Sequence, residues 1–126
     1  LEIYDFYIGG FRFDSGDFNF QRAGGASYFY YADFQRHFET NNVEGAERSR
    51  DYLYSLLKDK YESDGLYEIE NDQGFMCYLF GKNPRDASSR LGCIYLSRDK
   101  GKDGKTRLYL SLSYGPIYYV DKASDF

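Results

Sequence analysis

The residues of this chain with the widest chemical repertoire are two cysteines, Cys77 and Cys93. They lie in segments that we expect to form neighbouring antiparallel strands, and a register that pairs Phe80 with Arg90 places the cysteines directly opposite each other. Three interpretations are open: two free thiols in a core, a cross-strand disulfide in an exported protein, or a redox pair. No Cys-x-x-Cys motif supports the redox pair.

A metal or nucleophile site would need partners that the chain does not supply in a recognisable pattern. His37 is the only histidine, and no sequence context pairs it with a cysteine. The turn from Asp99 to Gly104 resembles the start of a calcium loop, but Gly101 stands at a ligand position and Leu110 replaces the final glutamate. No phosphate-binding or nucleophile-elbow motif is present. The sequence therefore predicts no catalytic residue, no metal and no cofactor.

Charge is unevenly distributed along the chain. The net charge is −4, which disfavours nucleic acid as a partner because an acidic protein repels phosphate backbones. Residues 82–107 nevertheless carry 8 basic and 3 acidic side chains. Within this segment, Arg98, Lys100 and Lys102 lie in an expected loop of residues 98–105, beside an expected turn at residues 71–74. These side chains are either solvated loop charges or recognise an acidic partner.

Tyrosine is the other abundant candidate for ligand binding, with 15 residues in the chain beside 11 phenylalanines. Tyr109, Tyr118 and Tyr119 are expected on strands of a C-terminal sheet. Exposed tyrosines are favoured at protein interfaces and sugar-binding surfaces, whereas buried ones would fill a core that lacks tryptophan. We therefore treat these three tyrosines, together with Arg98 and the two neighbouring lysines, as candidate ligand-binding residues.

Hydrophobic periodicity predicts the N-terminal elements of the chain. A strand is expected at residues 1–8, and a hairpin at residues 11–20 with its turn at residues 14–17. Tyr30, Phe34 and Phe38 recur every four positions, which favours a helix over residues 27–38, although the run from Tyr28 to Tyr31 has strand composition.

A second helix and a row of strands follow. The helix is predicted over residues 43–62, with an apolar face that contains Leu53, Leu56 and Leu57. Residues 106–114 alternate strictly, so Leu108, Leu110 and Leu112 should share one face of a strand and meet this helix. The other strands are expected at residues 66–70, 75–81, 91–97 and 117–120.

These elements predict one α+β domain over residues 1–126. An N-terminal strand and hairpin and one or two helices should pack on a four- to five-stranded antiparallel meander. The element order is similar to that of cystatin-like and NTF2-like architectures, a likeness that carries little functional weight because such folds host unrelated functions.

The leading functional expectation is a small non-catalytic binding or interaction module whose ligand is a protein, a small molecule or a glycan. The alternative is a small enzyme with a pocket between helix and sheet, and a further one is a homodimer that assembles through the sheet. No apolar run is long enough to span a membrane. An exported bacterial protein in the periplasm, at the surface or secreted is expected, with the cytoplasm as the alternative location.

Overall fold

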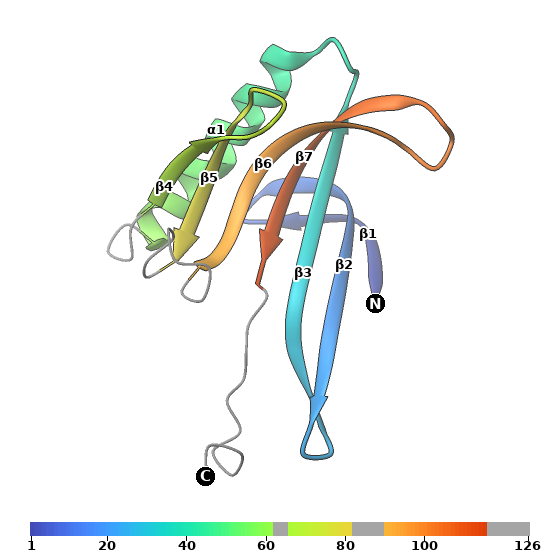
Figure 1. Ribbon diagram of the computed structural model, residues 1–126, viewed down its shortest axis with the longest axis vertical. Helices are drawn as coiled ribbons and strands as arrows, with labels where there is room; N and C mark the ends of the chain where they lie inside the picture. Colours follow the sequence, from blue (N-terminus) through green and yellow to red (C-terminus); the bar gives the residue numbers. More distant parts are fainter. Residues whose placement is uncertain (62–65, 82–89, 116–126) are drawn as a thin grey trace.

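The computed structural model describes residues 1–61, 66–81 and 90–115 (Figure 1). These residues form one α-helix and seven strands, which confirms the predicted α+β class. In chain order the elements are β1 (Glu2–Ile8), β2 (Phe11–Ala23), β3 (Ala26–Phe38), α1 (Val43–Tyr61), β4 (Leu66–Glu70), β5 (Met76–Gly81), β6 (Arg90–Lys100) and β7 (Thr106–Tyr114).

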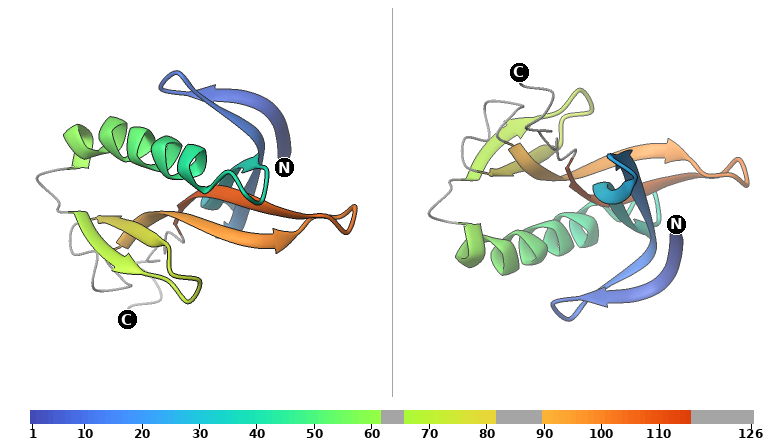
Figure 2. Two further views of the ribbon diagram at one scale, coloured as in Figure 1. Left: turned by 90° about the horizontal axis from the view of Figure 1, so that it is seen from above. Right: turned by 90° about the horizontal axis from the view of Figure 1, so that it is seen from below.

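All seven strands belong to one sheet in the order β1-β2-β3-β7-β6-β5-β4, and every neighbouring pair is antiparallel. The sheet is therefore two meanders, β1–β3 and β4–β7, that meet where β3 pairs with β7 (Figure 1). Figure 2 shows that α1 lies on one face of the sheet and that β1 and the start of β2 bend over towards the same side. The sheet is larger than the predicted four to five strands, since the N-terminal segments join it.

Residues 27–38 are strand β3, so the prediction of a helix there is wrong. The four-residue repeat of Tyr30, Phe34 and Phe38 fits a strand equally well, because positions that differ by four also share one face of a strand. Hydrogen bonding on both edges decides the conformation, since β2 and β7 flank this segment. The strand composition of the tyrosine-rich run pointed to the observed structure.

The predicted hairpin at residues 11–20 is also wrong, because β2 runs without interruption from Phe11 to Ala23. The true turns are the two glycine pairs, Gly9–Gly10 and Gly24–Gly25, whose φ angles are all positive, between 58° and 84°. Such turns suit glycine because it lacks a Cβ atom. The Asp-Ser-Gly-Asp run lies inside the strand, where Gly16 pairs with both Ile3 and Phe34.

The core lies between α1 and the face of the sheet that carries the alternating leucines. Leu108, Leu110 and Leu112 are buried and share a core with Leu53 of the helix, as predicted. Leu57 packs against the edge of this core, whereas Leu56 is 36% exposed and lies beside Gly9 of the β1–β2 turn instead of in the core with the leucines of β7. The last strand expected, residues 117–120, lies outside the described residues.

The buried guanidinium of Arg50 links α1 to β5. The side chain of Arg50 is only 7% exposed, and its Nη1 donates to the carbonyl oxygen of Met76 at 3.2 Å. The Tyr78 hydroxyl donates to Asp51 at 2.8 Å. Burial, together with the hydrogen bond to Asp51, raises the pKa of Tyr78 to about 12.

Within the described residues no helix has the length and apolarity needed to cross a membrane.

Candidate functional site

The face of the sheet opposite α1 is polar at the junction of the two meanders. On β3, Asp33 and Gln35 alternate with core residues, and the register places them beside Ser113 and Ser111 of β7. Because side chains of a strand point alternately to opposite faces, the same pairing that buries the leucines on one side collects these polar groups on the other.

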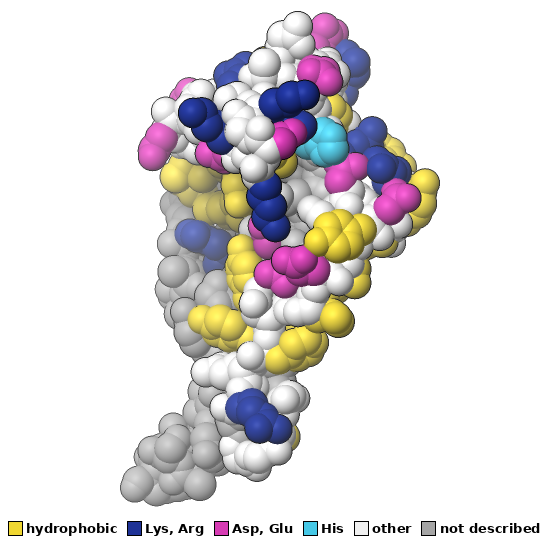
Figure 3. Space-filling view, turned by 90° about the vertical axis from the view of Figure 1, so that its right-hand side faces the viewer, with side chains coloured by type: hydrophobic (Ala, Val, Ile, Leu, Met, Phe, Trp, Pro, Cys, Tyr) yellow, Lys and Arg dark blue, Asp and Glu magenta, His cyan; other side chains and the backbone are white. Residues whose placement is uncertain are grey.

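A hollow of about 570 Å³ opens on this polar face. It lies between the N-terminal strands and the tip of the β6–β7 hairpin, and Figure 3 views this side of the molecule, where acidic and basic side chains are interspersed with hydrophobic ones. Four carboxylates and two lysines contribute to its wall. The lining residues are Glu2, Tyr4, Ser15, Gly16, Asp17, Asp33, Gln35, Asp99, Lys100, Gly101, Lys102 and Tyr109.

Asp33 is the best-defined polar group of this hollow. Its carboxylate accepts hydrogen bonds from Ser113 Oγ at 3.0 Å and from Gln35 Nε2 at 3.3 Å. The Tyr31 hydroxyl donates in turn to Ser113 Oγ at 3.3 Å. Burial raises the pKa of Asp33, the two hydrogen bonds oppose this rise, and the negative charge of Asp17 adds to it. Within the described part of the chain no cationic side chain forms an ion pair with Asp33.

Asp33 also affects its neighbours on the same face. Burial and then the negative charge of Asp33 raise the pKa of the Tyr95 hydroxyl on β6. Ser111, which pairs with both Gln35 and Tyr95, is 1% exposed, and its Oγ makes no well-formed hydrogen bond to the described residues. The negative charge of Asp33 therefore lies, without a cationic partner among the described residues, beside buried hydroxyl groups.

The β6–β7 hairpin carries the basic part of the hollow. Residues 98–105 were expected to form a loop, but β6 continues to Lys100, which pairs with Thr106, so the prediction is wrong for residues 98–100 and the loop is confined to residues 101–105. Arg107 donates to both carboxylate oxygens of Asp103, at 2.8 and 2.5 Å, and this lowers the pKa of Asp103. This ion pair holds the hairpin tip in place. On the opposite wall of the hollow, a hydrogen bond from Tyr4 and then the positive charge of Lys102 lower the pKa of Glu2.

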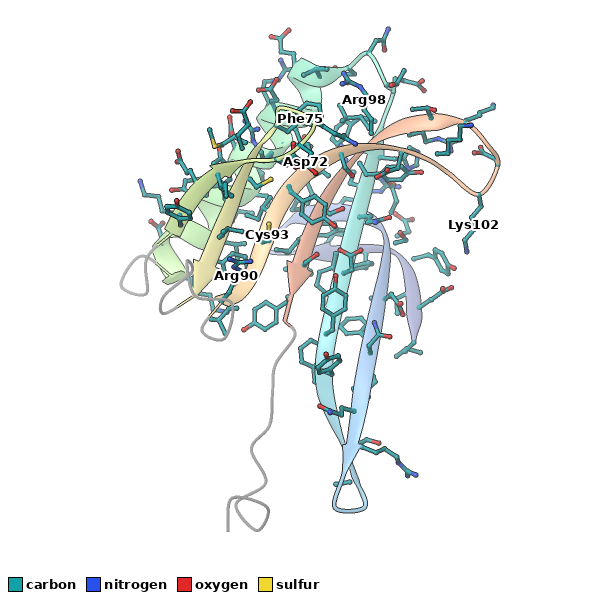
Figure 4. The ribbon with its side chains drawn as sticks, viewed as in Figure 1. Asp72, Phe75, Arg90, Cys93, Arg98 and Lys102 are labelled. Carbon is teal, nitrogen blue, oxygen red and sulfur yellow. The ribbon has the colours of Figure 1, made fainter. Side chains whose placement is uncertain are left out.

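Three of the six predicted ligand-binding residues, Tyr109, Lys100 and Lys102, line this hollow. Arg98 lies elsewhere, with its guanidinium 5.3 Å from the centre of the Phe75 ring at the β4–β5 turn (Figure 4). The predicted proximity of Arg98 to that turn is confirmed, since its backbone N–H donates to Gln73 Oε1 at 2.6 Å. The other two candidates, Tyr118 and Tyr119, lie outside the described residues.

The sequence interpretation missed the acidic side of the hollow. The alternation of Tyr31, Asp33, Gln35 and His37 is the signal that could have found it, because it places these polar residues on one face of a strand. The helical interpretation of residues 27–38 concealed that alternation. His37 is not in the hollow lining, and its Nδ1 lies 2.8 Å from Asp14.

Cys77 and Cys93 are free thiols on adjacent strands, with Cys93 near the start of β6 (Figure 4). Cys93 pairs with Leu79 and not with Cys77, so the register that would set the cysteines directly opposite is wrong by two residues. The shift arises because Gly81, rather than Phe80, pairs with Arg90 at a register irregularity. The thiols still interact diagonally: their hydrogen bond lowers the pKa of Cys77 and, with burial, raises that of Cys93.

Among the described residues no group of three or more His, Cys, Asp and Glu side chains could hold a metal ion.

We expect Asp33→Asn to stabilise the protein at neutral pH. A carboxyl whose folded-state pKa is raised favours folding below its unfolded pKa, and this contribution is lost as the pH rises through the folded-state pKa. Asparagine keeps a neutral side chain at every pH, so the free energy of unfolding should rise by up to about 1 kcal/mol near pH 7 and not near pH 3. Urea unfolding at both pH values measures this.

The exposed Asp59→Asn change in α1 removes the same charge far from the hollow and serves as the control. A loss of stability near neutral pH in Asp33→Asn that exceeds the loss in this control would contradict the argument.

We expect mild oxidation to join Cys77 and Cys93 in one intrachain disulfide, because the two thiols already interact. The intact protein should lose two hydrogens in mass, and no thiol should react with an alkylating reagent after unfolding. Cys93→Ser should keep one reactive thiol under the same treatment. Two alkylated cysteines in the oxidised parent protein would show that the diagonal geometry does not permit the bond.

Comparisons with known proteins leave the site to be interpreted from its own geometry. No model of a known protein family, no curated protein and no solved structure matches this chain.

Proposed function

We propose that this protein is a non-catalytic binding module that takes a cationic group, such as a lysine or arginine side chain of a basic peptide, in the hollow on its polar face. The observation that carries the proposal is Asp33, a half-buried carboxylate with a raised pKa and no cationic partner among the described residues. A bound cation would supply the missing positive charge and lower that pKa again.

The balance of charge in the hollow supports a cationic ligand. Glu2, Asp17, Asp33 and Asp99 outnumber the two lysines of the lining, and the whole chain has a net charge of −4. A hollow lined by one predominant sign of charge raises the local concentration of ligands of the opposite sign. Lys100 and Lys102 would then donate hydrogen bonds to carbonyl or carboxylate oxygens of the same ligand.

Two tyrosines complete the set of contacts. Tyr4 is 65% exposed, and Tyr109 belongs to the same lining. Aromatic faces attract ammonium and guanidinium groups and pack against the apolar stems of such side chains. A basic peptide is thus favoured over a free metal ion, which could use the carboxylates but not the aromatic rings.

The enzyme alternative has one observation in its favour. Tyr31, Ser113 and Asp33 form a chain of hydrogen bonds, and a carboxyl with a raised pKa is a suitable general acid or base. Beneath the middle of α1, however, the space between helix and sheet is filled by core side chains such as Leu53, which leaves no room among the described residues for a deep pocket there. A hollow as open and polar as the one around Asp33 fits binding better than chemistry that needs water to be excluded.

The test is a titration of the protein with a short arginine-containing peptide, in which the backbone amide chemical shifts are monitored by NMR. We expect saturable shifts that map to β3, β7 and the β6–β7 hairpin, and a loss of affinity of about tenfold in Asp33→Asn, because a hydrogen bond to a charged partner is lost. Affinity should also fall as the pH drops through the raised pKa of Asp33, since protonation removes the negative charge.

Asp59→Asn is the matched control, as it removes one negative charge on the exposed surface of α1. An uncharged peptide in which citrulline replaces arginine should not bind. Equal affinity in Asp33→Asn and Asp59→Asn would reject the proposed site, and equal binding of the two peptides would reject a cationic ligand.

A further inference from the structure

A second groove, separate from the hollow, lies between α1, the start of β2 and the end of β3. Its volume is about 430 Å³, and its lining contains Arg12, Arg36 and Arg48 but no acidic side chain. In Figure 2 the turn between β1 and β2 lies beside α1, and this arrangement brings the three elements together. Three arginines around one groove are unexpected in a chain with a net charge of −4.

Arg36 is held in place without an acidic partner. Its guanidinium lies 5.3 Å from the centre of the Phe11 ring and 5.2 Å from that of Phe38. No hydrogen bond or ion pair with another described residue engages it. Contact with two aromatic rings fixes the orientation of the planar group while its N–H donors stay available.

The other two arginines are positioned by carboxylates outside the groove. Arg12 contacts Asp5 at 2.8 Å and Asp14 at 2.9 Å. Arg48 contacts Glu44 at 2.9 Å in an ion pair whose side chains are 69% and 88% exposed. Such an exposed pair contributes little to stability, so Arg48 can exchange Glu44 for a ligand at low cost.

An aromatic surface adjoins the arginines. Tyr52 of α1 is 52% exposed, and its ring stacks on that of Phe11 at a centroid distance of 6.3 Å and an interplanar angle of 29°. Both rings belong to the groove lining. An exposed ring of this kind can stack on a planar group of a ligand.

We propose that this groove binds a small phosphorylated ligand with a planar ring, of the chemical class of a nucleoside monophosphate. Arginine is well suited to phosphate because its guanidinium can donate two parallel hydrogen bonds to phosphate oxygens. The ring of the ligand would stack on Tyr52. A small ligand is favoured over a nucleic acid because the acidic chain repels a long polyanion, whereas one phosphate interacts mainly with the nearby arginines.

The test uses the full chain and three probes: adenosine monophosphate, inorganic phosphate and adenosine. We expect calorimetry to show saturable binding of the monophosphate at millimolar concentrations. Its affinity should be at least about tenfold higher than that of either other probe, because only the monophosphate contacts the arginines through its phosphate and the Tyr52 ring through its base. Arg36→Gln should weaken this binding at least about tenfold. Tyr52→Leu should remove the preference for the monophosphate over inorganic phosphate. Affinity should fall as salt is added.

Arg22→Gln is the matched control, since it removes the same charge from an exposed position near the β2–β3 turn and should leave binding unchanged. If Arg36→Gln does not fold, as judged by circular dichroism, the exposed Arg48→Gln change replaces it with the same expected loss. The absence of saturable binding by the parent protein would overturn the proposal. Equal affinity in the folded arginine variant and in Arg22→Gln would overturn it as well.

Discussion

The pairing of β3 with β7 is the interaction on which the rest of the structure depends. It joins two meanders, β1–β3 and β4–β7, that are otherwise connected in sequence only through α1. Its register places Phe34 beside Leu112 in the core and Asp33 beside Ser113 on the opposite face. A slip of one residue would expose the leucines and bury the polar residues, so the burial of the core also fixes the geometry of the polar hollow.

The hollow contains a carboxylate, Asp33, whose charged form is disfavoured by its surroundings. Asp33 accepts two hydrogen bonds, yet burial and the neighbouring Asp17 still raise its pKa. The adjacent core residues hold it there, since Phe34 cannot leave the core without breaking the junction. A carboxylate kept in a place that disfavours its charge is common at functional sites, where stability is given up for binding or chemistry.

The sequence predicted elements whose hydrophobic pattern fits only one conformation. Residues 106–114 alternate strictly and form the expected strand, and the helix predicted over residues 43–62 is observed over residues 43–61 with Leu53 in the core. Residues 27–38 were wrongly assigned to a helix, because a repeat of four positions fits both a helix and a strand, and only the neighbours β2 and β7 decide between them. The same error hid Asp33. The cysteine register depended on one irregularity at Gly81, which no local pattern indicates.

The pKa of the Asp33 carboxyl is the most informative quantity to measure, because it reports whether the charge of this side chain is compensated in the free protein. It can be followed by NMR of the side-chain carboxyl carbon as the pH is varied, with Asp33→Asn used to assign the signal. We expect a pKa above the ordinary 3.8 in the free protein and a fall in this pKa when a cationic peptide is bound. A pKa at or below 3.8 in the free protein would rule out Asp33 as the binding group, because its negative charge would then already be compensated.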